Sequence, residues 1–192
     1  MDFQKILVKT AKILEELKIP YAITGGYAVS VWGRPRSTFD IDIIVEIFHP
    51  KTPALADALD KFSKLGQVDR KMMQEAINRK GEFNFIHVES GIKIDFWILD
   101  KNPFSISQLK RRKTKAIAER KIRFVSPEDL ILSKLIWHKK SGSDYQLKDV
   151  ESIIKRQKKL DWKYLKKWAA IQSTAKILEA LEKTLMIRKW PE

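Results

Sequence analysis

Three acidic residues in apolar segments could bind a divalent metal ion. Asp40 and Asp42 alternate with isoleucines in the run DIDIIV at 40–45, and Asp95 lies between Ile94 and Phe96. Side chains alternate faces along a strand, so Asp40 and Asp42 are expected to share one face, with the isoleucines in the core. Adjacent carboxylates repel unless a cation lies between them, and oxygen ligands suit Mg²⁺ or Mn²⁺. Three carboxylates on adjacent strands could hold two ions that clamp the attacking and leaving oxygens of a phosphoryl transfer.

A glycine pair precedes the acids and suits phosphate binding. The run YAIT at 21–24 predicts a short strand that Gly25-Gly26 ends, and thirteen residues separate Gly26 from Asp40. A strand that turns into a helix through glycines exposes backbone N–H groups, which lets a phosphate approach closely. Arg34 and Arg36, before the acidic strand, could reach further phosphate oxygens.

Each feature alone has a simpler explanation. An Asp-x-Asp pair is usually a solvated strand face, and Gly-Gly is usually only a turn. Their combination, in this order and followed by a third acid, favours a site. The three histidines have no metal-ligand spacing and are interpreted as structural, and the basic stretch 110–123 is a candidate track for a phosphate backbone.

The elements that must position these residues change in type along the chain. Alternating and helical periodicities predict helices at 2–18 and 53–65, strands at 21–24, 40–45 and 122–125, and a hairpin formed by 83–88 and 92–99. From Ser126 onward only helical periodicity remains, with helices near 127–140, 145–157, 161–171 and 173–187. We therefore predict an α+β fold, with a core at 1–125 and a C-terminal helical bundle at 126–192.

Composition excludes several classes of protein. The 192 residues contain no cysteine, which excludes disulfides, thiolate zinc sites and a cysteine nucleophile. No apolar run approaches the roughly 20 residues of a membrane span, and the start does not resemble a secretory signal, so we expect a cytoplasmic protein. The formal net charge is +14; residues 1–100 carry 14 basic and 14 acidic side chains, and residues 101–192 carry 24 and 10. This asymmetry favours a polyanionic partner, with nucleic acid ahead of an acidic membrane surface, although a solvated helical surface would explain it too.

The motifs resemble the signature of the DNA polymerase beta-type nucleotidyltransferase superfamily. That signature is Gly followed by Gly or Ser, a spacer, and an Asp-apolar-Asp pair, which Gly25-Gly26 and Asp40-Ile41-Asp42 match. The runs GRPRSTFDID at 33–42, SPEDLILSKL at 126–135 and QLKDV at 146–150 resemble a small stand-alone branch related to AbiEii-type nucleotidyltransferase toxins. The resemblance implies a small mixed nucleotidyltransferase sheet flanked by helices.

The resemblance also implies roles for individual residues. Asp40 and Asp42 match the metal-binding pair, and Asp95 matches the third carboxylate, which helps to activate the acceptor hydroxyl. Gly25 and Gly26 match the turn that holds the triphosphate. Where many members have Ser, this chain has Gly26, so Ser30 or Thr38 would supply the hydroxyl contact. Lys134 lies where related proteins place a basic residue that faces the nucleotide, and Arg36 is expected to neutralise developing charge.

Together these features predict a metal-dependent enzyme that moves a nucleoside monophosphate from an NTP to an acceptor hydroxyl. The charge favours a nucleic-acid acceptor such as the 3′ end of a tRNA. The same chemistry on a small molecule or a protein side chain is the first alternative. A non-catalytic nucleic-acid-binding or toxin–antitoxin module is the second, and an antitoxin or neighbouring protein would then be a partner.

Overall fold

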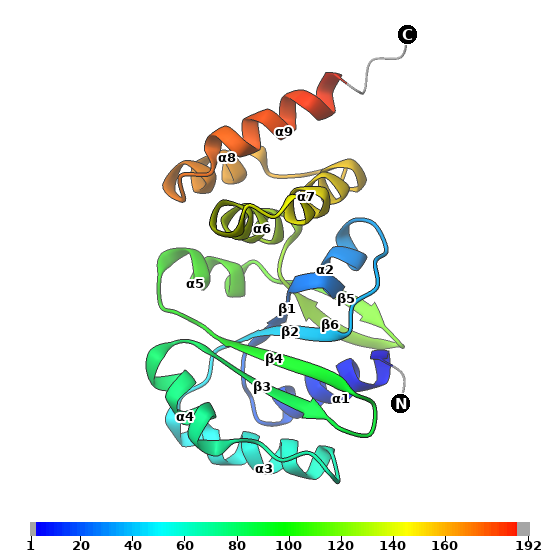
Figure 1. Ribbon diagram of the computed structural model, residues 1–192, viewed down its shortest axis with the longest axis vertical. Helices are drawn as coiled ribbons and strands as arrows, with labels where there is room; N and C mark the ends of the chain where they lie inside the picture. The colour runs from blue at the N-terminus through cyan, green and yellow to red at the C-terminus, as the bar shows by residue number, and fades with distance from the viewer. Residues whose placement is uncertain (1–2, 188–192) are drawn as a thin grey trace. The chain divides into compact units, whose positions relative to one another are not determined.

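A six-stranded mixed sheet forms the centre of the first part of the chain. The computed structural model describes residues 3–187 (Figure 1). The strands are β1 (Tyr21–Ile23), β2 (Asp40–Val45), β3 (Glu82–His87), β4 (Ile92–Ile98), β5 (Lys113–Ile117) and β6 (Arg120–Phe124). Their order is β3-β4-β2-β1-β6-β5, in which β2 with β4 and β1 with β6 are parallel pairs and the other neighbours are antiparallel.

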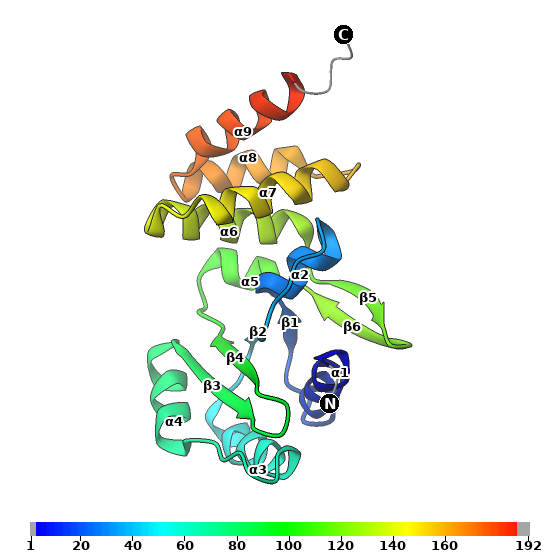
Figure 2. The ribbon, with the colours of Figure 1, turned by 45° about the vertical axis from the view of Figure 1, so that its right-hand side comes forward.

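Helices cover one face of this sheet. They are α1 (Phe3–Glu16), α3 (Thr52–Phe62) and α4 (Arg70–Arg79), which lie together on the same side in both views (Figures 1 and 2). A 3-10 turn, η1 (His49–Lys51), precedes α3, and α5 (Pro103–Lys110) follows β4. The apolar side chains of the central strands, such as Ile41, Ile43 and Phe96, are fully buried.

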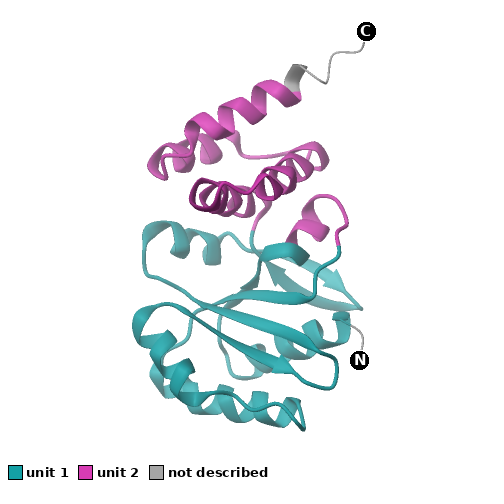
Figure 3. Cartoon of the chain, in the orientation of Figure 1, with its two compact units in different colours: residues 1–27, 37–125 teal, residues 28–36, 126–192 magenta. Residues whose placement is uncertain are grey.

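The chain forms two compact units (Figure 3). Residues 1–27 and 37–125 form the first unit, and residues 28–36 and 126–192 form the second. Helix α2 (Gly25–Trp32) therefore begins in one unit and continues into the other. The segment 28–36 groups with the C-terminal helices, although it lies within the range expected from the sequence for the core.

Besides the segment 28–36, the second unit contains four described helices that pack on one another. They are α6 (Pro127–Ser141), α7 (Asp144–Arg156), α8 (Trp162–Ile171) and α9 (Ala175–Ile187). Ser126 caps the start of α6, where its hydroxyl accepts from the backbone N–H of Asp129, and Gly142, with a φ of 69°, caps the end. Such an N-cap and a left-handed glycine define the ends of a helix.

The predicted α+β class is confirmed by this mixed sheet and its helices. Four helices follow residue 126 in the described chain, close to the ranges that the periodicity predicts. Within residues 3–187, no helix is long and apolar enough to span a membrane.

Candidate active site

The register of β2 against β4 brings the predicted acids together. These strands are parallel, and Asp42 lies opposite Asp95 while Asp40 lies opposite Lys93. Residues opposite each other on neighbouring strands share a face of the sheet. Ile41 and Ile43 are fully buried on the other face, as the alternation predicts. The three carboxylates therefore occupy one face, away from the buried isoleucines.

Each of the three carboxylates accepts a hydrogen bond from a different kind of donor. The Thr38 hydroxyl donates to Asp40 Oδ1 at 2.6 Å. The indole N–H of Trp97 donates to Asp42 Oδ1 at 3.3 Å. The ammonium of Lys93 lies 2.8 Å from Asp95 Oδ2. These contacts fix the carboxylates on the sheet, and Asp95, which is only 8% exposed, is the most enclosed of them.

Lys93 is a cation in direct contact with this acidic face. The hydrogen bond to Asp95 raises the pKa of Lys93, and the negative charges of Asp95, Asp40 and Asp42 raise it further against the opposing effect of burial. Because all three carboxylates raise the pKa of Lys93, their negative charges act on the same region of the sheet face. A divalent cation would be attracted to that region.

The glycine turn lies directly against one of the acids. Gly25 begins α2 with a φ of +62°, and a Cβ atom built on it would overlap the carboxylate of Asp42. The backbone N–H of Thr24 donates to the carbonyl oxygen of Asp42 at 2.9 Å, which fixes the turn to the acidic strand. Glycine is therefore required at position 25 both by the backbone conformation and by the close approach of Asp42.

The donor set fits a hard divalent cation in its chemistry. Asp42 and Asp95 are direct neighbours in register, Asp40 lies two residues away on the same face, and all three offer carboxylate oxygens. Within residues 3–187, no three His, Asp or Glu side chains are already gathered as a ready set of metal ligands. Asp95 Oδ2 is paired with the Lys93 ammonium in this structure. This oxygen would exchange the ammonium for the metal ion when a metal binds.

Three residues predicted to bind the nucleotide belong to the second unit. The Ser30 hydroxyl accepts from the backbone N–H of Arg36 at 3.2 Å and donates to its carbonyl oxygen at 3.1 Å. Arg36 Nη1 lies 2.8 Å from Asp149 Oδ2, and Lys134 Nζ lies 3.1 Å from the same oxygen. Asp149 is fully buried, so its carboxylate links the two cations in a low-polarity environment. Thr38, in contrast, contacts Asp40 in the first unit, where Gly26 also lies.

Asp149, Lys93 and Trp97 were not among the predicted site residues. The sequence carries a signal for each. Asp149 lies four residues before Ile153, on the apolar side of α7. Lys93 and Trp97 lie two residues before and after Asp95, which places them on its face of the strand.

Comparison with solved structures shows that the fold is similar to that of nucleotidyltransferases. The antibiotic-resistance factor ANT(2'')-Ia matches with a TM-score of 0.59 and 17% identity, over 94% of this chain and 97% of its own. The lincosamide antibiotic adenylyltransferase LnuA matches with a TM-score of 0.51 and 17% identity, over 80% and 98%. A nucleotidyltransferase-like protein from Paracoccidioides brasiliensis matches with a TM-score of 0.52 and 19% identity, over 93% and 92%. No protein-family model and no curated protein sequence matches the chain.

Proposed function

We propose that the chain is a metal-dependent nucleotidyltransferase that moves a nucleoside monophosphate from an NTP to an acceptor hydroxyl. The observation that carries this proposal is the register of β2 and β4, in which Asp42 lies opposite Asp95 and against Gly25. The carboxylates provide the negative charge that a metal ion needs, and the glycine turn lets the phosphates of the NTP approach backbone N–H groups closely.

In this reaction the acceptor oxygen forms a bond to the α-phosphorus of the NTP. The bond from that phosphorus to the bridging oxygen of the β-phosphate breaks, and pyrophosphate leaves. Asp95 orients the acceptor and receives its hydroxyl proton, while backbone N–H groups of Gly25 and Gly26 bind the β- and γ-phosphates. Mg²⁺ or Mn²⁺, held by Asp40, Asp42 and Asp95, would supply positive charge to the reacting phosphates.

Roles for the cations of the second unit are part of the same proposal. Arg36 and Lys134 are held together by the buried carboxylate of Asp149. Side chains fixed in this way are suited to bind phosphate oxygens with little loss of conformational entropy. Ser30 supports this arrangement by holding the backbone of Arg36.

The acceptor that we favour is a nucleic acid, because residues 101–192 carry 24 basic and 10 acidic side chains. A small-molecule acceptor is the second candidate, because two of the similar structures are named for antibiotics or antibiotic resistance. The two differ in their response to salt: acceptor binding that weakens steeply with salt favours nucleic acid.

The test is transfer of label from each NTP to separate pools of RNA, protein and small metabolites, with Mg²⁺ or Mn²⁺ present. We expect label in one pool, and loss of that label in Asp42→Asn, which keeps the shape of the side chain. Glu75→Gln is the matched control, because it removes one exposed charge from α4 in the same unit. Absence of label from every pool with both metals would reject the catalytic proposal.

We further propose membership of the branch related to AbiEii-type toxins, with a neighbouring protein that restrains the activity. The motifs at 126–135 and 146–150 support this. Expression of the chain alone should slow bacterial growth, and Asp42→Asn should restore it. Equal growth of the two strains at equal protein levels would reject the toxin role without bearing on the chemistry.

A further inference from the structure

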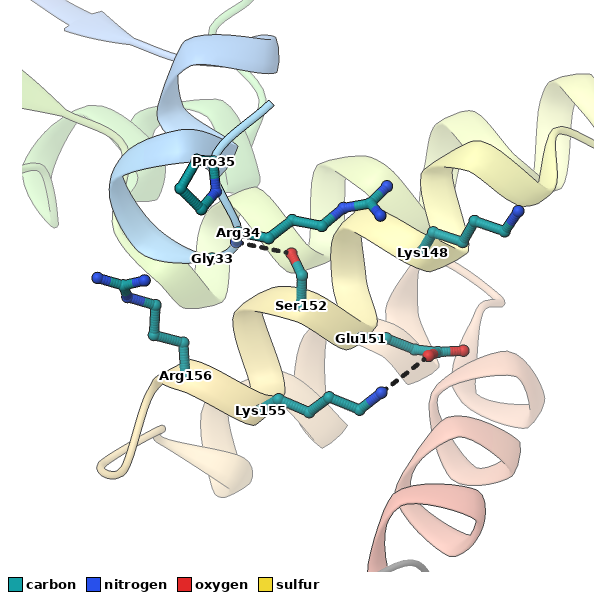
Figure 4. A pocket seen from close by; sticks show the side chains of 8 residues that line it. All are labelled: Gly33, Arg34, Pro35, Lys148, Glu151, Ser152, Lys155 and Arg156. Carbon is teal, nitrogen blue, oxygen red and sulfur yellow. Dashed lines mark hydrogen bonds and ion pairs between the residues drawn. The ribbon is translucent and has the colours of Figure 1, made fainter. Parts of the chain in front are cut away.

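A basic hollow lies within the second unit, on the surface of α7. It has a volume of about 490 Å³ and is lined by four cationic side chains, Arg34, Lys148, Lys155 and Arg156, with Glu151 as its one acid (Figure 4). Lys155 pairs with Glu151 at 3.4 Å. The lining therefore keeps an excess of positive charge.

The spacing of these residues follows from the helix. Lys148, Ser152, Lys155 and Arg156 lie at i, i+4, i+7 and i+8 along α7, which places them on one side of it. The opposite side carries Val150 and Ile153, which are fully buried. The amphipathic pattern of α7 thus directs its cations outward over about two turns.

The loop at 33–36 is fixed onto this helix. The backbone N–H of Arg34 donates to the Ser152 hydroxyl at 3.3 Å, and the side-chain amide of Gln157 donates to the carbonyl oxygen of Trp32 at 2.5 Å. A Cβ atom on Gly33 would overlap Ser152 Oγ, so the loop packs directly against α7. Figure 4 shows Arg34 extending along the helix toward Lys148, with Arg156 on the other side of Gly33. These contacts fix the wall of the hollow that the loop forms against α7.

An exposed aromatic ring adjoins the cations. Tyr145 is 48% exposed, three residues before Lys148 on α7. The guanidinium of Arg36 lies 4.7 Å from its ring centroid, and that of Arg34 lies 6.0 Å away. Proteins that bind single-stranded nucleic acid typically combine a row of cations along the sugar–phosphate backbone with an exposed aromatic ring on which a base can stack.

We infer that this hollow binds the phosphates of a single-stranded RNA acceptor. The inference rests on the proposed function, since it names the class of acceptor and the surface that holds it. Lys148 and Arg156 are the best residues to test, because both side chains are exposed and neither forms a hydrogen bond or ion pair with the residues that the structure describes. Their replacement leaves the internal contacts of the unit unchanged.

The test is binding of a labelled single-stranded RNA of about 16 nucleotides, measured by fluorescence anisotropy over a salt series. No NTP is present, and EDTA prevents transfer. We expect the double variant Lys148→Gln/Arg156→Gln to bind more weakly than the wild type. The slope of log Kd against log salt should fall by about 1.4, since each lost phosphate contact on a single strand contributes about 0.7.

The matched control is Lys163→Gln/Lys167→Gln, which removes the same charge from exposed positions on α8. The control variant should keep the wild-type slope. Equal weakening by both double variants would overturn the inference, as would absence of RNA binding by the wild type. Competition by ATP as effective as that by RNA, at equal phosphate concentration, would also overturn it, because the hollow would then bind free nucleotide phosphates.

The two proposals fail separately. Pyrophosphate release from NTP, measured on the same preparations, reports the reaction alone. RNA binding that depends on Lys148 and Arg156 without any pyrophosphate release would reject the nucleotidyltransferase and keep the hollow. Pyrophosphate release with RNA binding indifferent to these residues would reject the hollow and keep the enzyme.

Discussion

Gly25 and Asp42 are in such close contact that no side chain fits between them. A Cβ atom at position 25 would overlap the Asp42 carboxylate, and the φ of +62° disfavours any residue other than glycine. The glycine turn therefore packs directly against the acidic strand, and the hydrogen bond from the Thr24 N–H to the Asp42 carbonyl oxygen joins the two.

Gly25→Ala is expected to destabilise the fold by about 2–4 kcal/mol. About 1 kcal/mol comes from the left-handed backbone and about 1–3 kcal/mol from displacement of Asp42. Gly91→Ala is the control, because Gly91 has a φ of +67° with nothing within 4 Å of its Cβ position. Urea unfolding of both variants measures the difference. Equal losses would show that the contact with Asp42 has no energetic consequence.

Asp149→Asn should lower the free energy of unfolding by about 3 kcal/mol, because it leaves two enclosed cations without their counter-charge. Lys134 and Arg36 expose only 10% and 19% of their side chains. The comparison is Glu182→Gln, whose ion pair with the 57% exposed Lys166 should be worth less than about 1 kcal/mol. Denaturant unfolding followed by tryptophan fluorescence measures both. A similar small effect in the two variants would contradict this account.

Ser126→Ala should cost more than the usual helix cap. Ser126 is fully buried, accepts from the Asp129 backbone N–H and donates to Asp129 Oδ2 at 2.6 Å. Loss of the cap costs about 1 kcal/mol, and loss of the donor to a buried carboxylate adds about 1–3 kcal/mol. Asn102→Ala removes the cap of α5 together with a hydrogen bond to Asp100, and because both are exposed the loss should stay at about 1 kcal/mol, the cost of a cap. Thermal unfolding of the two variants measures these losses of stability. An equal loss would show that the hydrogen bond from the Ser126 hydroxyl to Asp129 adds nothing to stability.

Glu89 is expected to make stability depend on pH. It accepts hydrogen bonds from the Ser63 hydroxyl and the Lys64 backbone N–H, at 2.5 Å and 2.6 Å, and the Ser63 bond is the main cause that lowers the pKa of Glu89 to about 2. A carboxyl whose pKa is lower in the folded chain stabilises it above the unfolded value of about 4.3, and that contribution disappears as the pH falls toward 2.

Glu89→Gln should therefore be less stable than the wild type at pH 7. The difference should shrink between about pH 4.3 and pH 2. Urea unfolding across this interval measures it, with Glu82→Gln, an exposed position on β3, as the control. A constant difference between the two curves would show that Glu89 is not responsible.

Local sequence patterns determined much of the fold. Alternation in the run 40–45 predicted a strand with Ile41 and Ile43 buried, and both are. Helical periodicity after Ser126 predicted four helices near their observed positions. The pattern predicted neither α4, α5 nor β5. Helix α4 is strongly polar, and β5 carries lysines at an exposed sheet edge, so neither has the apolar signal from which elements are read.

Only the tertiary structure decided which residues meet. The sequence placed Asp40, Asp42 and Asp95 on strands, but the parallel register that sets Asp42 opposite Asp95 joins positions 53 residues apart. Arg36 and Asp149 form an ion pair across 113 residues, which brings the segment 28–36 into the second unit. Periodicity reports how a segment alternates between solvent and core, whereas such pairings depend on the packing of the whole chain. Local sequence patterns thus indicated which residues could take part in the chemistry, and long-range packing decided which of them lie together.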